Sequence, residues 1–346
     1  MQYSLRLLRV FFLVALLFGC KDDPVLPDPP PVAEEGHSVF VLNEGNYQSG
    51  NASVTSINLQ SGAITEDMFH QSNHRPVGDV LQSLSVVNGE GWLVVNNSQK
   101  IERVNLRSME AMQPITGFNS PRFVLEVSPQ KAYVTDLYAN QIHIVNVASG
   151  AISGHIPCPG WTEQLILTGN EAWVCNVRKN KVYVINTVTD RLIDSVSVGD
   201  EPASIVQDSE NRIWVLCGGK IPPGETAGSL WRIDPSTHAV LYSLPFPSVS
   251  IHPARLKLNA AKTSLYFIYK DVFRIGITDT ELPSTPVISS GNKLLYGLGI
   301  RSQDDEIWVS DARDFVQKGA VFRYSASGAM LNTYEVGFIP GSFYFY

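Results

Sequence analysis

The chain has 346 residues with 26 basic and 33 acidic side chains, a net charge of −7 at pH 7 with neutral histidines. This acidic balance argues against nucleic acid and against a polybasic membrane patch as partners. The four cysteines have no spacing typical of a zinc or redox motif, so they indicate neither a metal nor a cofactor.

Residues 1–20 have the pattern of a bacterial lipoprotein signal peptide. Arg6 and Arg9 precede an apolar run, residues 10–18, that is too short to span a bilayer, and LFGC ends at Cys20. The pattern predicts cleavage before Cys20 and attachment of lipid to its thiol. An ordinary secretory signal followed by a chance cysteine is the alternative. Removing the two arginines of the signal leaves 24 basic and 33 acidic residues, a net charge of −9.

Residues 21–36, KDDPVLPDPPPVAEEG, are rich in proline and acidic residues. Such a segment cannot bury enough apolar surface to fold, so we expect an extended tether. The run CKDD resembles the export tag of Bacteroidetes-type lipoproteins. The resemblance implies an anchor in the outer membrane, facing the cell exterior, although a solvated linker explains the same charges.

Seven short runs with an apolar-aromatic-apolar centre repeat along residues 37–346 at intervals of 40 to 52 residues. A proline-led alternating segment precedes most of them, and two further alternating segments follow. Four antiparallel strands recurring about every 40 residues are typical of a β-propeller, so we predict an all-β fold of seven four-stranded blades. The aromatic anchors of the seven runs are Phe40, Trp92, Tyr133, Trp173, Trp214, Tyr266 and Trp308.

The two ends of the repeat region complement each other. The first unit lacks an upstream strand, and the last has a surplus one, IPGSFYFY at residues 339–346, whose Pro340 aligns with Pro121, Pro202 and Pro253. We therefore predict that the end of the chain supplies the innermost strand of the first blade. This closes the ring and removes an exposed edge.

Two segments carry a resemblance to known families. AYVTDLYANQIHIVNVASGAI, residues 132–152, resembles the YVTN-repeat family of seven-bladed propellers, and blades six and seven depart most from its pattern. VFVLNEGNYQSGNASVTSINLQSGAI followed by RPVGDVLQSL is similar to the opening of a propeller family of Bacteroidetes surface lipoproteins. This second resemblance implies a TonB-dependent outer-membrane transporter as partner, and cobalamin is the ligand of some members.

Ligand sites in propellers usually lie on the rim where innermost strands begin and second strands end. Three residues after each aromatic anchor, mostly polar side chains stand at this rim, which suits a polar ligand, although Asn and Asp also cap strand ends by bonding their own backbone. The rim loops of blades one, five and seven are long. The ligand-binding candidates are Asn43, Glu44, Asn46, Tyr47, Arg75, Asp79, Asn96, Arg122, Asp136, Tyr138, Trp161, Asn176, Arg178, Tyr269, Tyr296, Asp311, Arg313 and Phe315.

No catalytic motif stands in the sequence. His70 and His74 flank QSN in an expected loop, so they do not predict a metal pair. We therefore expect a lipid-anchored protein that binds a small molecule, corrinoid-like or glycan, with no catalytic residue, metal or cofactor and no nucleic-acid partner. Two alternatives stay open. One is a propeller lactonase or lyase that gathers Asp136, Glu163 and Asp311 around a channel metal, and the other is a glycan-binding or adhesion module.

Overall fold

The computed structural model describes residues 32–346. The signal peptide, Cys20 and residues 21–31 of the expected tether lie outside the described residues. The last part of that tether already belongs to the folded domain, because Ala33 is buried and its N–H donates to the carbonyl of Arg107 at 2.7 Å. Among the described residues, no helix is long and apolar enough to cross a membrane.

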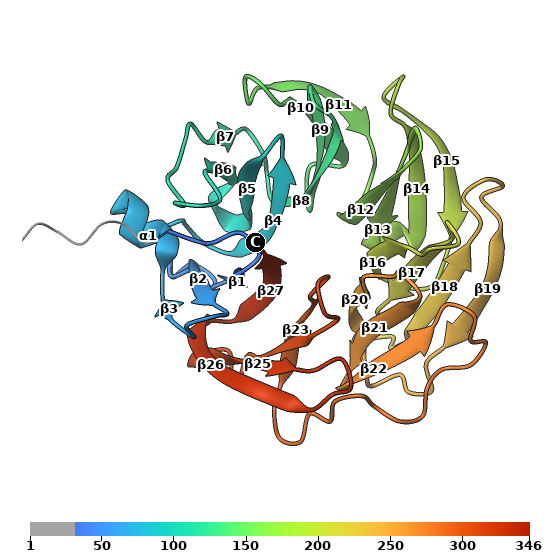
Figure 1. The fold of residues 1–346 in the computed structure, drawn as a ribbon. Coiled ribbons are helices and arrows are strands. Elements are labelled where there is room, and N and C mark those ends of the chain that lie inside the picture. The colour runs from blue at the N-terminus through green and yellow to red at the C-terminus, as the bar shows by residue number, and fades with distance from the viewer. Residues whose placement is uncertain (1–31) are drawn as a thin grey trace, which may run out of the picture. The chain divides into compact units, whose positions relative to one another are not determined.

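Residues 32–346 form seven antiparallel sheets arranged around a central channel (Figure 1). From the channel outwards, blade 1 consists of β27 (Pro340–Phe345), β1 (Ser38–Asn43), β2 (Ser53–Asn58) and β3 (Ile64–Thr65). Blade 2 consists of β4 (Leu81–Val87), β5 (Glu90–Val95), β6 (Lys100–Val104) and β7 (Ile115–Thr116). Blade 3 consists of β8 (Pro121–Ser128), β9 (Lys131–Asp136), β10 (Gln141–Asn146) and β11 (Ile152–Pro157). Blade 4 consists of β12 (Thr162–Thr168), β13 (Glu171–Asn176), β14 (Lys181–Asn186) and β15 (Arg191–Ser197).

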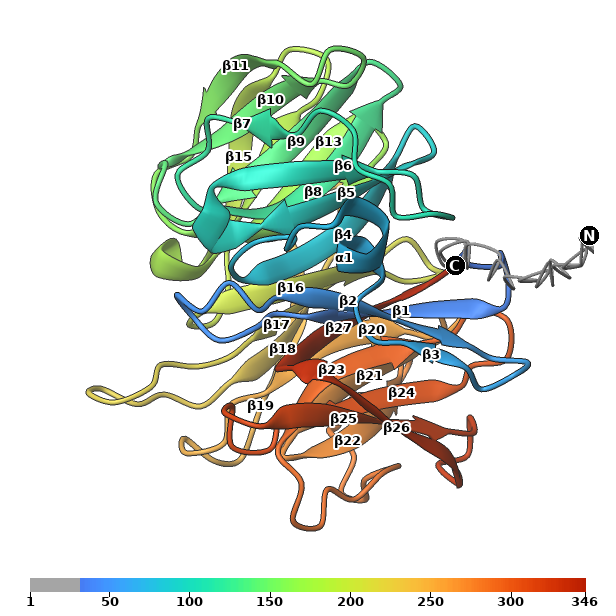
Figure 2. The same cartoon turned by 90° about the vertical axis from the view of Figure 1, so that its left-hand side faces the viewer.

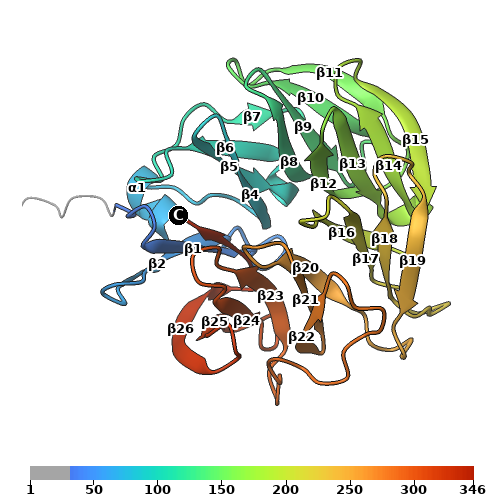
Figure 3. The same cartoon turned by 45° about the vertical axis from the view of Figure 1, so that its right-hand side comes forward.

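The remaining blades continue the same order, with β12, β16 and β20 near the centre and β15 and β19 at the periphery (Figure 3). Blade 5 consists of β16 (Pro202–Gln207), β17 (Ile213–Cys217), β18 (Ser229–Ile233) and β19 (Val240–Pro245). Blade 6 consists of β20 (Ala254–Leu258), β21 (Ser264–Tyr269) and β22 (Asp271–Gly276). Blade 7 consists of β23 (Leu295–Ile300), β24 (Ile307–Asp311), β25 (Lys318–Tyr324) and β26 (Met330–Phe338). The seven-bladed fold is confirmed.

Blade 6 departs from the predicted four strands. Its sheet has three, and where a fourth would lie there is one isolated bridge between Val272 and Ile288. The segment before the bridge contains Pro283 and Pro286. Proline has no N–H to donate to a ladder, which explains why this segment forms no regular outer strand.

The predicted ring closure is confirmed. β27 pairs antiparallel with β1, with Phe40 opposite Tyr344, and Figure 2 shows the two strands side by side. The ring of Phe40 also stacks on Tyr346 with centroids 5.6 Å apart. First and last strands of the propeller thus share one sheet, which removes the free inner edge of β1.

The aromatic anchors all lie on the second strand of their blade and are almost fully buried. Each hydrophobic cluster joins neighbouring blades; for example, Trp92 of blade 2 packs with Val124 and Val134 of blade 3. Burial of a large apolar side chain contributes about 2–3 kcal/mol, so the repeated anchors stabilise the seven blade interfaces in turn.

A short helix, α1 (Met68–Asn73), joins blades 1 and 2. Asp67 caps it by accepting a hydrogen bond from the N–H of His70, and His74 ends it in the left-handed conformation. The sequence interpretation of a loop here was wrong, because the Asp67 cap and the buried pair Met68 and Phe69 together favour one helical turn. Two 3-10 turns, η1 (Asn96–Ser98) and η2 (Val177–Lys179), lie at the rim.

Candidate ligand cavity at the mouth of the channel

Each of the seven innermost strands has a register shift against its partner near the strand's first residues, at the same end of the channel, and β8 has a second shift at its other end. Such bulges bend a strand and re-aim its side chains. Near the first residue of each innermost strand, the regular ladder pairing is therefore interrupted. This end of the channel, here called the mouth, is the rim that the sequence predicted to carry a ligand site.

Seven equivalent residues surround the mouth, one from each innermost strand. Each is the second residue of its strand, where the strand of blade 6 is counted from Pro253. We call them the mouth ring. The ring is charged or polar over blades 2, 3, 4 and 7, and it is reduced to small side chains over blades 5, 6 and 1. Its members are Gln82, Arg122, Glu163, Ala203, Ala254, Tyr296 and Gly341.

On one side of the mouth, Arg122 links the ring members of three blades. Its guanidinium pairs with Glu163 at 2.8 Å and donates to the side-chain oxygen of Gln82. It also lies over the indole of Trp161, 5.9 Å from the ring centroid, and the indole N–H donates to Glu163. Glu163 is almost fully buried. Charged hydrogen bonds of this kind hold the indole in one orientation at the edge of the channel.

On the other side, Glu44 occupies the place that Gly341 leaves open. It accepts a hydrogen bond from the hydroxyl of Tyr296 at 2.9 Å and lies 3.4 Å from the guanidinium of Arg255. A Cβ at Gly341 would lie 2.3 Å from Glu44 Oε1, so only glycine leaves room for the carboxylate. Burial raises the pKa of Tyr296 to about 12, with the Glu44 carboxylate acting in the same direction. The phenol therefore remains a proton donor at neutral pH.

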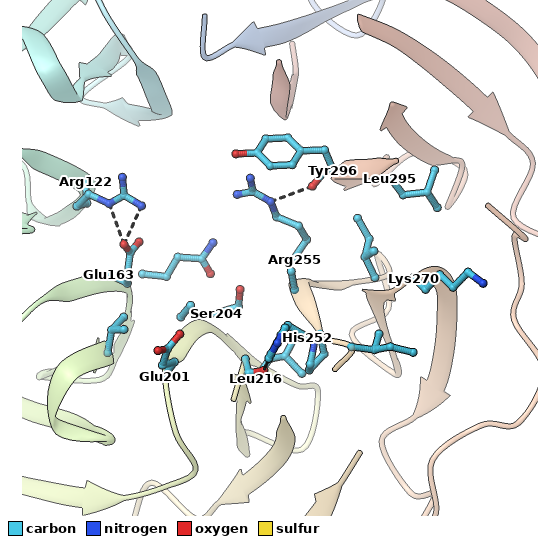
Figure 4. Close-up of a pocket in the computed structure, with 18 of the residues that line it drawn as sticks. Arg122, Glu163, Glu201, Ser204, Leu216, His252, Arg255, Lys270, Leu295 and Tyr296 are labelled. Atoms are coloured by element: carbon cyan, nitrogen blue, oxygen red, sulfur yellow. Dashed lines mark hydrogen bonds and ion pairs between the residues drawn. The ribbon is translucent and has the colours of Figure 1, made fainter. Parts of the chain in front are cut away.

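Between these two groups the alanines of blades 5 and 6 leave the ring open. A cavity of about 610 Å³ occupies this opening and is lined by both alanines. Figure 4 shows the Arg122–Glu163 pair and the Arg255–Tyr296 pair facing the cavity, with His252 and Ser204 along the wall formed by blades 5 and 6. Small-molecule pockets usually have volumes of about 300–1,000 Å³, so the opening has the size of such a site.

The cavity carries more positive than negative charge although the whole chain is acidic. Four of its lining residues are cationic and two are anionic, with His252 counted as neutral. Arg122 and Arg255 face the cavity, whereas the Lys293 ammonium lies over the Phe322 ring and Lys270 points outwards (Figure 4). Because low-dielectric walls concentrate the field of charged side chains, the cavity favours an anionic or strongly hydrogen-bonding ligand. The cationic residues are Arg122, Arg255, Lys270 and Lys293, and the acidic ones are Glu163 and Glu201.

Of the predicted candidates, Arg122, Trp161 and Tyr296 line the cavity, and Glu44 supports it from behind. Tyr269 ends β21 but packs on Phe246 with ring centroids 4.7 Å apart, so its phenol belongs to the blade interior.

Four candidates at strand ends hold their own loops and do not reach the cavity. Asn43, Asp136 and Asn176 are fully buried, and Asp311 accepts hydrogen bonds from the N–H groups of Leu294 and Arg313. Asp136 alone accepts four backbone N–H bonds. In the structure these strand-end side chains bond their own loops or neighbouring strands, as Asn43 does with Thr55 at 2.9 Å, and ligand contact by them stays a prediction.

Three further candidates connect blades. Asn96 is buried and donates to the hydroxyl of Ser120 and the carbonyl of Pro121. Arg75 forms a bidentate pair with Glu102 on the third strand of blade 2, away from the mouth. Asp79 accepts from the N–H of Gln48 at 2.9 Å and ties the rim loop of blade 1 to blade 2.

The last candidates lie on the rim loops outside the cavity. Asn46 donates to the carbonyl of Phe315, whose ring meets Tyr296 edge-on at 5.6 Å, so the loops of blades 1 and 7 together support the Tyr296 side of the mouth. Tyr47, Tyr138 and Arg178 are exposed, and the half-buried Arg313 pairs with Glu335 at 2.6 Å.

Several lining residues were missed by the sequence prediction. Glu201 and His252 directly precede Pro202 and Pro253, and Lys270 directly follows the second strand of blade 6. Trp161 directly precedes Thr162, the first residue of β12, so Glu201 and His252 occupy the position in blades 5 and 6 that Trp161 occupies in blade 4. Asp136, Glu163 and Asp311 do not gather around the channel, and residues 32–346 hold no group of three or more His, Cys, Asp or Glu side chains placed to bind a metal.

Fold and cavity together define a seven-bladed β-propeller with an open ligand-sized site at one end of its channel. The chain belongs to the family described as "Domain of unknown function (DUF5074)", whose model matches residues 37–345. No curated protein matches the sequence.

Several solved structures share the fold. A quinonprotein alcohol dehydrogenase-like protein from Bacteroides thetaiotaomicron has a TM-score of 0.70 at 12% identity, over 90% of this chain and 78% of the other. A protein from Lactobacillus plantarum has a TM-score of 0.65 at 14% identity, over 90% and 99%. Apo AztD from Citrobacter koseri has a TM-score of 0.54 at 10% identity, over 90% and 98%. At these identities the likeness concerns the fold alone.

Proposed function

We propose that this protein is a binding protein that captures a polar, anionic small molecule in the mouth cavity. The observation that carries the proposal is the interrupted mouth ring, a preformed opening between two rigid groups that contain both aromatic and cationic side chains. Preorganised sites of this kind bind without the entropic cost of ordering their side chains. The lipoprotein pattern and the acidic run after Cys20 support display on the outer membrane, with delivery of the ligand to a TonB-dependent transporter.

A corrinoid such as cobalamin is the ligand class that we put first. Its phosphodiester and peripheral amides suit cationic and hydrogen-bonding walls, and its flat macrocycle suits the face of Trp161 or Tyr296. The cavity is open to solvent, so a ligand larger than the cavity could bind with one end inside. We propose binding without chemistry, because Glu163, the most deeply buried acid of the cavity, is already engaged by Arg122 and Trp161.

Isothermal titration with cyanocobalamin tests the ligand, with an anionic glycan panel in parallel. Ala203→Trp fills the opening of the ring and should weaken binding about tenfold or more, which corresponds to ~1.4 kcal/mol. Ala239→Trp is the matched control, because Ala239 is equally exposed but lies in the loop between β18 and β19. Absence of heat at micromolar corrinoid would refute the corrinoid version, and equal affinity in Ala203→Trp would refute the mouth as the site.

The membrane and partner proposals have their own tests. Cys20→Ala should move the protein from the membrane fraction to the soluble fraction, and protease added to intact cells should digest the wild-type propeller. Co-purification of a TonB-dependent transporter from solubilised membranes tests the partner. Retention of Cys20→Ala in the membrane would contradict the lipid anchor.

A further inference from the structure

A second cavity lies deeper in the channel and is continuous with the first. It has a volume of about 300 Å³ and shares Gln82, Phe123, Gln164 and Arg255 with the mouth cavity. Its other walls are residues further along the innermost strands. We call it the inner cavity. The two cavities therefore adjoin each other along the channel.

The inner cavity has two charged lining residues, and both are cationic. They are Arg255 and Lys257, and the remaining walls are neutral amides, serine hydroxyls and apolar side chains. This differs from the mouth, where Arg122 pairs with Glu163 at 2.8 Å. Arg255 has one acidic partner, Glu44 at 3.4 Å, and its Nε donates to the backbone carbonyl of Tyr296 at 3.1 Å. The inner cavity thus has a surplus of positive charge with no acid in its lining.

Lys257 stands at a position where no other blade has a charge. It pairs in register with the aromatic anchor Tyr266 of its blade. The residues that pair with the anchors of the other blades are Ser85, Leu125, Ile166, Val206, Gly299 and Tyr344. A repeat that tolerates serine and apolar residues here has no structural need for an ammonium group.

The ammonium of Lys257 has no counter-ion within residues 32–346, where it forms neither a salt bridge nor a hydrogen bond. The side chain is half-buried in the wall of the inner cavity. Burial lowers its pKa to about 8, and the neighbouring Arg255 acts in the same direction. At neutral pH most molecules therefore keep a partly desolvated cation here with no counter-ion among residues 32–346, an arrangement that favours the arrival of an anion.

We propose that Lys257 and Arg255 form an anion site in the inner cavity, which takes a carboxylate or a tetrahedral oxyanion such as a phosphate group. The site deepens the proposed function, and rests on it in so far as the anion is one end of a ligand seated at the mouth. A cavity of about 300 Å³ has room for such a group with its water, and the neutral amides of Gln82 and Gln164 can donate further hydrogen bonds.

Sulfate is the probe, because it keeps its charge over the whole pH range of interest. Thermal unfolding of the purified chain is measured in sulfate and in chloride at equal ionic strength, with acetate as the carboxylate arm. The wild type should gain a saturable stabilisation, since a ligand that binds the folded state raises its stability. In Lys257→Leu the apparent affinity should fall about tenfold or more, leaving only the general effect of sulfate. Lys179→Met, which removes an exposed lysine from the same rim, should behave as the wild type.

Two further measurements separate anion binding from a structural role. In chloride, Lys257→Leu should unfold at a temperature no lower than the wild type, because the change removes an unpaired charge. Sulfate affinity of the wild type should fall as the pH rises through about 8, where Lys257 loses its proton, since Arg255 is the other charged group of the lining and stays charged. The variant Lys257→Arg should keep its affinity for sulfate above a pH of about 8.

The proposal is overturned if Lys257→Leu responds to sulfate and acetate as the wild type does. A lower unfolding temperature of Lys257→Leu in chloride would overturn it as well, because the ammonium would then stabilise the fold by itself. The two proposals fail separately. If the chain binds sulfate but no corrinoid, the proposed ligand is refuted and the anion site is not. If Lys257→Leu leaves the corrinoid affinity unchanged and the chain does not respond to sulfate, the anion site is refuted and the proposed ligand is not.

Discussion

Removal of residues 339–346 should unfold the propeller or leave it prone to aggregation. The truncation deletes β27, which supplies five register pairs to β1 and the aromatic side chains of residues 343–346. Phe343 and Phe345 contact Trp308 with ring centroids 6.2 and 6.0 Å apart, and Tyr344 and Tyr346 stack on Phe40.

The size of this loss follows from its parts. With about 1 kcal/mol net for the ladder hydrogen bonding of each of the five register pairs, and about 1 kcal/mol for each of the four half-buried rings, the loss is on the order of 9 kcal/mol. Single domains have a free energy of unfolding of about 5–15 kcal/mol, so the truncation removes a large part of the total. It also exposes the inner edge of β1, a template for pairing with other chains.

Scanning calorimetry and analytical ultracentrifugation of the full and truncated chains test this prediction. Phe343→Ala is the graded comparison, because it keeps the strand and removes one ring. We expect it to lower the free energy of unfolding by about 1–2 kcal/mol, the loss of one half-buried ring and its contacts. A truncated chain that stays monomeric and melts within a few degrees of the full chain would refute the closure argument.

Three other outcomes follow from the same structure. Glu163→Gln should lower the free energy of unfolding by about 1–2 kcal/mol in urea titrations, because it breaks the buried pair with Arg122, whereas the exposed Glu335→Gln should change it by less than about 0.5 kcal/mol. Burial alone would lower the pKa of His238, but hydrogen bonds to Asp194 and Glu171 raise it above 6.5. The stabilisation from protonated His238 is therefore fully present below pH 6.5 and lost as pH rises through the raised pKa. His238→Gln should flatten the resulting slope of the unfolding free energy against pH, and an unchanged slope would contradict this prediction. Burial raises the thiol pKa values of three cysteines, so iodoacetamide should modify them only after unfolding, and rapid labelling of the native chain would show that they are accessible. These are Cys158, Cys175 and Cys217.

The fold could be predicted from the repeat because each aromatic anchor packs at a blade interface in the same way. Trp92, Trp173, Trp214 and Trp308 recur on the second strand of their blades, and a buried aromatic at a blade interface leaves the same pattern in every unit. The ring closure was predictable for a related reason. The surplus strand at residues 339–346 had no other partner in a fold whose inner edges must be paired.

The site was less predictable, because one residue type serves two purposes at a strand end. Asp136 and Asp311 stand where a ligand contact was expected, but their carboxylates accept backbone N–H bonds of the following turns. Nothing in a single sequence distinguishes a side chain that caps its own turn from one that faces a cavity. Arg75 misled for another reason, since its partner Glu102 lies on the third strand, outside any local pattern.

The repeat nevertheless contains more information about the mouth than the strand-end positions gave. Arg122 and Glu163 hold equivalent positions in blades 3 and 4 and are 41 residues apart, which is about one blade. Equivalent positions of neighbouring innermost strands are adjacent in space, so polar partners one period apart predict contacts across the mouth. By the same logic, small residues at two neighbouring equivalent positions predict an opening, and Ala203 and Ala254 mark the cavity. The charge of Lys257, at a position that is neutral in the other blades, is a signal of the same kind. In a repeat fold, the position that departs from its equivalents is the one that requires a functional explanation.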